Sequence, residues 1–167
     1  VPLCNWTHWL EPIGGGVGRD KIQQPKPVEQ TQALLQARIW SDYVWYETSF
    51  TVQHPLLQNA TLVVQTQKSN SLVVFLNDDY AGEANHHDPG EGDMTLSIRL
   101  GSLRHGTYQL AILSESLGYF NLVGNDQYTR RQKKKGITGS VLLKGGVEKN
   151  QSYVQQLVDG RMWNTRP

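Results

Sequence analysis

The chain has 167 residues, with sixteen Lys and Arg against fifteen Asp and Glu, and a formal net charge of +1. This length suits one domain, and the near-neutral charge provides no overall field to attract nucleic acid or an anionic membrane. The longest apolar runs have only strand length, so no transmembrane segment is predicted. A single cysteine, Cys4, excludes an internal disulfide. We therefore expect one domain, 1–167, with neither nucleic-acid nor membrane partners.

Glycine, proline and β-branched residues favour short strands joined by tight turns, and no window shows a sustained apolar stripe at helical spacing. Residues 14–32 combine a run of glycines with two prolines, which predicts a surface connection. Residues 30–38 have weak helical potential, enough for a single turn. Strands are predicted at 43–53, 61–67, 71–77, 80–84, 94–100, 106–114, 137–143 and 152–158. Eight short strands with polar turns between them are typical of an all-β fold, a β-sandwich jelly roll.

Aromatic residues are concentrated in two of these predicted strands. β-branched and aromatic residues between 39 and 52 favour extended backbone, and we expect Trp45 to be buried with Tyr43 on the same face. In the second strand a short apolar run meets Asn-Asp-Asp at 77–79, which predicts a hairpin turn. Aromatic strand residues of a sandwich usually belong to its core, and we expect this of Trp40, Trp45, Tyr46 and Phe75.

The motifs D-Y-x-W-Y-x-T-x-F at 42–50 and F-L-N-x-x-Y-x-G at 75–82 together resemble a known domain type. It is the galactose-binding-like jelly roll that follows the catalytic barrel in family 35 β-galactosidases, particularly the plant-like ones. The K-G-I-x-G-x-V motif at 135–141 and the apolar and serine-containing segment 103–118 are similar to further strands of that domain. A weaker likeness covers 153–160, where Val158-Asp159 replaces the expected continuation.

The resemblance implies a domain that binds carbohydrate or supports a neighbouring catalytic domain of the same chain. In the family, the catalytic glutamates lie on a barrel that this chain does not contain, so we expect no enzymatic activity from the chain alone. The expected function is a non-catalytic carbohydrate-binding or supporting domain of a β-galactosidase-like glycan-processing protein. The alternative is a structural interaction domain without sugar affinity, attached to another glycan-processing enzyme.

Sugar recognition combines an aromatic ring, which covers the apolar side of a pyranose, with polar groups that bond its hydroxyls. Two predicted loop segments, 78–88 and 119–128, bring such residues together in the sequence. The candidate carbohydrate-binding residues, for a galactoside-like ligand, are Asp78, Asp79, Tyr80, Tyr119, Asn121, Asn125 and Asp126.

Three other patterns have ordinary explanations. The glycines at 14–18 lack the strand, helix and Lys-Ser/Thr pair of a phosphate loop. We interpret the basic run 130–135 as a solvated loop, which could also face a partner domain. Around His86-His87-Asp88 the residue types of a metal site are present, but a solvated acidic loop is the simpler interpretation, and no metal or cofactor is predicted. Structural calcium held by loop carboxylates is an alternative that the spacing does not indicate.

Three sequences of the form N-x-[ST] begin at Asn5, Asn59 and Asn150. Nine asparagines placed at random would give only about one such match. The excess indicates a protein of the secretory pathway, lysosomal or extracellular. Because residues 1–4 show no basic leader followed by an apolar run, we expect the chain to be part of a longer protein.

Overall fold

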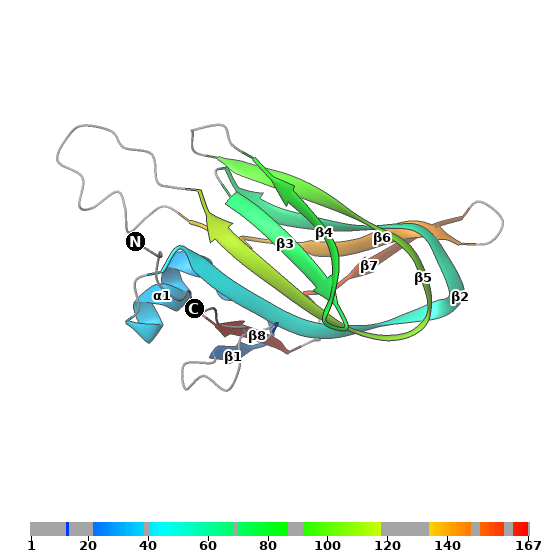
Figure 1. The fold of residues 1–167 in the computed structure, drawn as a ribbon, viewed down its shortest axis with the longest axis horizontal. Coiled ribbons are helices and arrows are strands. Elements are labelled where there is room, and N and C mark those ends of the chain that lie inside the picture. The colour runs from blue at the N-terminus through cyan, green and yellow to red at the C-terminus, as the bar shows by residue number, and fades with distance from the viewer. Residues whose placement is uncertain are drawn as a thin grey trace, which may run out of the picture.

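The computed structural model describes residues 13, 22–38, 41–68, 70–86, 92–117, 134–147, 151–158 and 162–166. Its elements are β1 (Ile22–Gln24), α1 (Gln30–Ala37), β2 (Tyr43–Gln67), β3 (Asn70–Leu76), β4 (Asp79–Asn85), β5 (Asp93–Ser116), β6 (Val141–Val147), β7 (Gln151–Gln156) and β8 (Trp163–Arg166) (Figure 1). Strands hold 72% of the described residues and the helix 7%, which confirms the all-β class.

Two long strands, β2 and β5, belong to both layers of a sandwich. They pair antiparallel from Tyr43 opposite Glu115 to Gln67 opposite Asp93. The first part of β2 and the last part of β5 join β1, β8, β3 and β4 in what we call the β3 layer. Their other parts join β6 and β7 in the β6 layer. Figure 1 shows β2 and β5 curving together at the right of the view, where one layer passes into the other.

The bend coincides with irregular pairing. The register of β2 against β5 shifts three times between Val52 and Thr61, and Asn59 has a positive φ of 49°. On the facing strand, Gly101 and Gly106 also have positive φ. Bulges insert unpaired residues and bend the strand that contains them. Each long strand was expected as two separate ones, 43–53 with 61–67 and 94–100 with 106–114, and the structure joins each pair through this bend.

The core lies between the two layers and follows the two-residue repeat of the strands. In β3, for example, Leu72 and Val74 are fully buried while Val73 between them is half-buried. The largest fully buried side chains come from both layers and are Trp163, Tyr46, Phe50, Leu57, Leu62, Leu72, Ile98, Leu110, Ile112, Ile137, Leu143 and Leu157.

The segment before β2 contains regular elements and is held to the sandwich by hydrogen bonds. Glu29 caps α1 by accepting hydrogen bonds from the backbone N–H groups of Thr31 and Gln32. The buried side chain of Gln30 donates to Asp42 O at 2.9 Å and accepts from Ser114 Oγ at 3.0 Å. The prediction for 14–32 is therefore wrong at β1 and at the start of α1, and the single turn expected at 30–38 is an eight-residue helix.

The K-G-I segment fastens the same end of the sandwich. Lys135 is buried, and its Nζ donates to Lys68 O at 2.9 Å. The carbonyl of Gly136 accepts from Thr66 Oγ1 at 2.6 Å. Gly136 has a φ of +73°, and a Cβ there would collide with the hydroxyl of Tyr46. The strand predicted at 137–143 begins only at Val141, because residues 134–140 form these anchoring contacts instead.

Candidate functional site

The outer face of the β3 layer has apolar side chains at its centre, whereas that of the β6 layer is mostly polar. Residues that alternate with core positions point outward. On the β6 layer, these pair as Thr61 with Arg99, Val63 with Ser97 and Gln65 with Thr95. On the β3 layer, the outward residues of β2, β5 and β3 include Tyr43, Trp45, Ala111, Leu113, Val73 and Phe75. Apolar side chains on the outside of a sheet mark a candidate interaction surface.

Strand register arranges this face in two adjacent rows that cross five strands. The first row runs through Arg166, Trp45, Leu113, Val73 and Glu83. The second runs through Asn164, Glu47, Ala111, Phe75 and Tyr80. Both rows have aliphatic or aromatic side chains on β5 and β3 and polar ones on β8, whereas the β4 end holds Glu83 in the first row and Tyr80 in the second.

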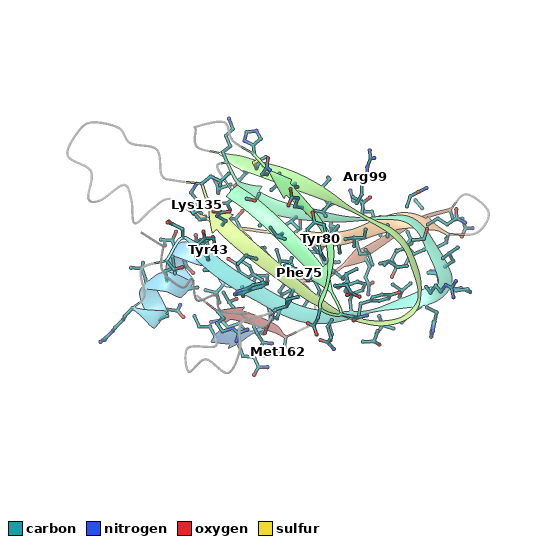
Figure 2. The ribbon with its side chains drawn as sticks, viewed as in Figure 1. Tyr43, Phe75, Tyr80, Arg99, Lys135 and Met162 are labelled. Carbon is teal, nitrogen blue, oxygen red and sulfur yellow. The ribbon has the colours of Figure 1, made fainter. Side chains whose placement is uncertain are left out.

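Four aromatic residues dominate the surface, and we call them the aromatic face: Tyr43, Trp45, Phe75 and Tyr80. The ring centroids of Trp45 and Phe75 lie 5.8 Å apart at 45°, and those of Phe75 and Tyr80 lie 6.2 Å apart at 79°. Trp45 is only 9% exposed, Phe75 is half-buried, and Tyr43 and Tyr80 are 48% and 60% exposed. In Figure 2, Phe75 and Tyr80 lie beside each other over β3 and β4.

Carboxylates flank the two exposed tyrosines. The charge of Glu115 raises the pKa of Tyr43, and a side-chain hydrogen bond between the two groups adds to this effect. Desolvation raises the pKa of Tyr80, and the charge and hydrogen bond of Glu83 raise it further. Each hydroxyl is thus held close to an acceptor on the same face.

An ion pair closes the β8 side of the face. Arg166 donates to Glu47 with an Nη2 to Oε1 distance of 2.7 Å, and both side chains are mostly buried. A pyranose offers an apolar side of C–H groups and an edge of hydroxyls. The aromatic face presents both kinds of group, rings and carboxylate oxygens.

Of the seven predicted site residues, the structure places Tyr80 on this face. Asp78 lies in the turn between β3 and β4, and Asp79 is the first residue of β4. Both are exposed, and the alternation of the strand turns Asp79 away from the side on which Tyr80 lies. The other four candidates lie outside the described residues: Tyr119, Asn121, Asn125 and Asp126.

Sequence reasoning missed Trp45 and Phe75 as site residues by assigning them to the core. Tyr46 does belong to the core, and the burial of Trp45 is confirmed, but Trp45 and Phe75 contact each other on the outside of the β3 layer. The signal was present in the second strand: if Leu72, Val74 and Leu76 face inward, Phe75 must face outward. Trp40 lies outside the described residues.

The other candidate sites receive no support from the part of the chain that the structure describes. That part contains no group of three or more His, Cys, Asp and Glu residues that could hold a metal ion, although His87 and Asp88 lie outside it. In the basic run, Lys134 is exposed but Lys135 is buried, so the solvated-loop prediction is wrong for Lys135.

Among the described residues, no helix has the length and apolar character needed to cross a membrane. The models of known protein families and the curated protein sequences give no match to the chain. The case for a function therefore rests on the geometry of the aromatic face and on the motifs that build it.

Proposed function

We propose that the chain is a non-catalytic carbohydrate-binding domain of the galactose-binding-like jelly-roll type, belonging to a β-galactosidase-like glycan-processing protein. The protein would be secreted or lysosomal, with the catalytic centre elsewhere in the longer chain. The observation that carries this proposal is the aromatic face, in which exposed rings lie beside carboxylates on an otherwise regular sheet.

Tyr80 is the centre of the proposed sugar site. Tyr80 is 60% exposed and its ring meets that of Phe75 in an edge-to-face arrangement, so the residue contacts its neighbour and still presents a large surface to solvent. Glu83 lies near enough to hydrogen-bond the Tyr80 hydroxyl. A pyranose stacked against this ring would place its hydroxyl edge within reach of the same carboxylate.

The tilt of the rings favours a single sugar or a flexible chain over a flat insoluble surface. Rings at 45° and 79° to their neighbours cannot all lie against one plane. They can contact different sides of one curved ligand. A galactoside fits this description, because its axial hydroxyl leaves one apolar side of the ring free for stacking.

The motifs behind the family resemblance support the same proposal. D-Y-x-W-Y-x-T-x-F lies on β2 and supplies Tyr43 and Trp45. F-L-N-x-x-Y-x-G forms the β3–β4 hairpin and supplies Phe75 and Tyr80. The two motifs lie side by side across β5, so the resemblance and the candidate site depend on the same residues.

The test is a titration of the chain with methyl β-galactoside and lactose, followed by amide chemical shifts and tryptophan fluorescence. We expect weak binding, with the largest shifts in β3 and β4. Tyr80→Ala should weaken binding at least tenfold, because it removes the most exposed ring. Arg99→Ala is the matched control, since Arg99 is an exposed side chain on the outside of the other layer (Figure 2).

Shifts that follow the sugar concentration but avoid the aromatic face would refute this site. Complete absence of binding across a broad glycan array would favour the alternative, a structural interaction domain. Turnover of a chromogenic β-galactoside that disappears when a single carboxylate is changed would refute the non-catalytic assignment.

A further inference from the structure

We propose that Asn59 carries an N-linked glycan when the chain passes through the secretory pathway, at the end of the sandwich where β2 and β5 bend. This inference does not depend on sugar binding by the aromatic face. Asn59-Ala60-Thr61 is the one N-x-[ST] sequence whose three residues all lie within the described ranges. The pattern marks surface positions of secreted proteins.

The local backbone presents Asn59 to solvent. It lies between two shifts of register, and neither β5 nor β6 supplies a residue directly opposite it. Its φ of 49° takes it out of the regular strand, a conformation that asparagine tolerates well. The following residue, Ala60, is buried, so the bulge is fixed from the inside while the Asn59 side chain stays exposed.

The third residue of the pattern is also well placed. Thr61 Oγ1 donates to the carbonyl of Asn59 at 3.3 Å in exposed surroundings. The hydroxyl that completes the acceptor pattern therefore lies beside the backbone of Asn59 at the exposed bulge. Asn70, which is fully buried, is not followed by this pattern.

The surroundings leave room for a bulky group. Gly101 is opposite Ala60 on β5, and a Cβ there would meet no atom within 4 Å. On the other side, Gly146 is opposite Gln58 on β6, and a Cβ there would meet only Gln58 O, at 3.9 Å. The two strands that adjoin the bulge therefore place no side chain opposite Gln58 and Ala60, the neighbours of Asn59.

The third residue of a second acceptor pattern lies near the same bend. That pattern begins at Asn150, which is outside the described residues, and its Ser152 is opposite Gly146, which is in turn opposite Gln58. The adjoining edge strand, QSYVQQ, has no charge and no proline, and its Val154 is 60% exposed. Uncharged edges invite pairing with other chains. A glycan near this edge would hinder such pairing. Figure 1 shows the bend of β2 and β5 at the opposite end of the molecule from α1 and the start of β2.

The modification requires an oligosaccharide donor linked to a lipid through pyrophosphate. Asn59 Nδ2 forms a bond to the anomeric carbon of the sugar and loses one proton. The bond between that carbon and the pyrophosphate oxygen breaks, and the lipid pyrophosphate leaves with the electron pair. One C–N bond replaces one C–O bond at the anomeric carbon, so no atom is oxidised or reduced and no oxidant or reductant is needed.

The test is to secrete the chain from eukaryotic cells behind a cleavable leader and to map its peptides by mass before and after peptide N-glycanase. We expect the Asn59 peptide to carry an oligosaccharide that the enzyme removes, leaving aspartate at the site. Asn59→Asp and Thr61→Val should each lose one glycan, whereas Thr61→Ser, which keeps the hydroxyl, should retain it. Asn59→Asp also tolerates the positive φ.

An unmodified Asn59 peptide from the secreted chain would overturn the proposal if a glycoprotein secreted by the same cells is modified normally. Retention of the full glycan mass in both Asn59→Asp and Thr61→Val would overturn it equally. Two variants are used so that poor secretion of one of them does not prevent the comparison.

Discussion

Gly136 fixes the K-G-I segment against the core because it lacks a side chain. Its φ of +73° is strained for other residues, and an added Cβ would collide with the Tyr46 hydroxyl and approach Gln30 Cβ at 2.9 Å. We expect Gly136→Ala to lower the free energy of unfolding by about 2–4 kcal/mol, from backbone strain together with overpacking. Urea denaturation measures the change.

Gly101→Ala is the matched control for that prediction. Gly101 has a similar φ of +78°, but a Cβ there would meet nothing within 4 Å. Gly101→Ala should lower the free energy of unfolding only through backbone strain, by about 1–2 kcal/mol. Equal losses in the two variants would show that the contact with Tyr46 is not what requires glycine at position 136.

Tyr46 gives the fold a dependence on alkaline pH. Burial raises the pKa of its hydroxyl well above the ordinary value of 10, and the N–H of Ile137 donates to that hydroxyl at 3.4 Å. The folded state therefore keeps a proton that the unfolded chain releases near pH 10. The corresponding stability is complete below this pH and is lost as the pH rises above it.

Tyr46→Phe should remove this dependence. At neutral pH the variant should lose about 1 kcal/mol, because the hydrogen bond from Ile137 is gone. As the pH rises above about 10, the unfolding free energy of Tyr46→Phe should fall less steeply than that of the original chain, because the variant has no hydroxyl proton for the folded state to retain. Urea titrations at a series of pH values check this, and parallel slopes in the two proteins would contradict it.

Asn77 and Asp78 form the turn of the β3–β4 hairpin, and both have a positive φ, 51° for Asn77 and 69° for Asp78. This is the two-residue turn that prefers Asn-Gly. Asn77 also continues the sheet, because its Oδ1 accepts from the N–H of Gln109 at 2.8 Å. Asp78→Gly should therefore raise the unfolding free energy by about 0.5–1 kcal/mol by relieving strain.

The same variant decides the role of Asp78 in sugar binding. Because Asp78 lies in the turn and Tyr80 on the open face, we expect Asp78→Gly to bind galactosides as the original chain does. Asn77→Ala, which loses the hydrogen bond with Gln109, serves as a destabilising comparison. A large loss of affinity in Asp78→Gly without loss of stability would show that the Asp78 carboxylate belongs to the sugar-binding site.

Most strand positions could be predicted from the sequence because each strand alternates strongly, as in 71–77 and 80–84. The short strands β1 and β8, with three and four residues, carry no pattern of their own and form by pairing with each other and with β2. The continuity of β2 through its bend also escaped prediction, since bulges interrupt the repeat that marks a strand.

The candidate site was predicted only at Tyr80. Local alternation tells which residues share a face, but which face the partner layer covers depends on contacts between distant strands. Trp45 and Phe75 come from strands separated by β5, and only the assembled sheet brings their rings together. The alternation in β3 separates Phe75 from Leu72 and Val74, but only the assembled sheet shows which of the two sides the other layer covers.

Because β2 and β5 run through both layers, we expect the two layers to unfold together. Leu143 on β6 and Leu72 on β3 are both fully buried in the same core. Leu143→Ala should lower the free energy of global unfolding by about 2–5 kcal/mol. Hydrogen exchange would then show the slowest amides of β3 and of β6 losing protection by the same free energy.

Leu72→Ala is the reciprocal variant, with the cavity in the other layer. It should lower protection in β6 as much as in β3, because global unfolding is the common route of exchange for both. If Leu143→Ala weakened protection only in β6 and Leu72→Ala only in β3, the layers would open separately. The shared strands would then act as a hinge between two cooperative units, and an independently stable β3 layer would keep its aromatic face when β6 and β7 detach.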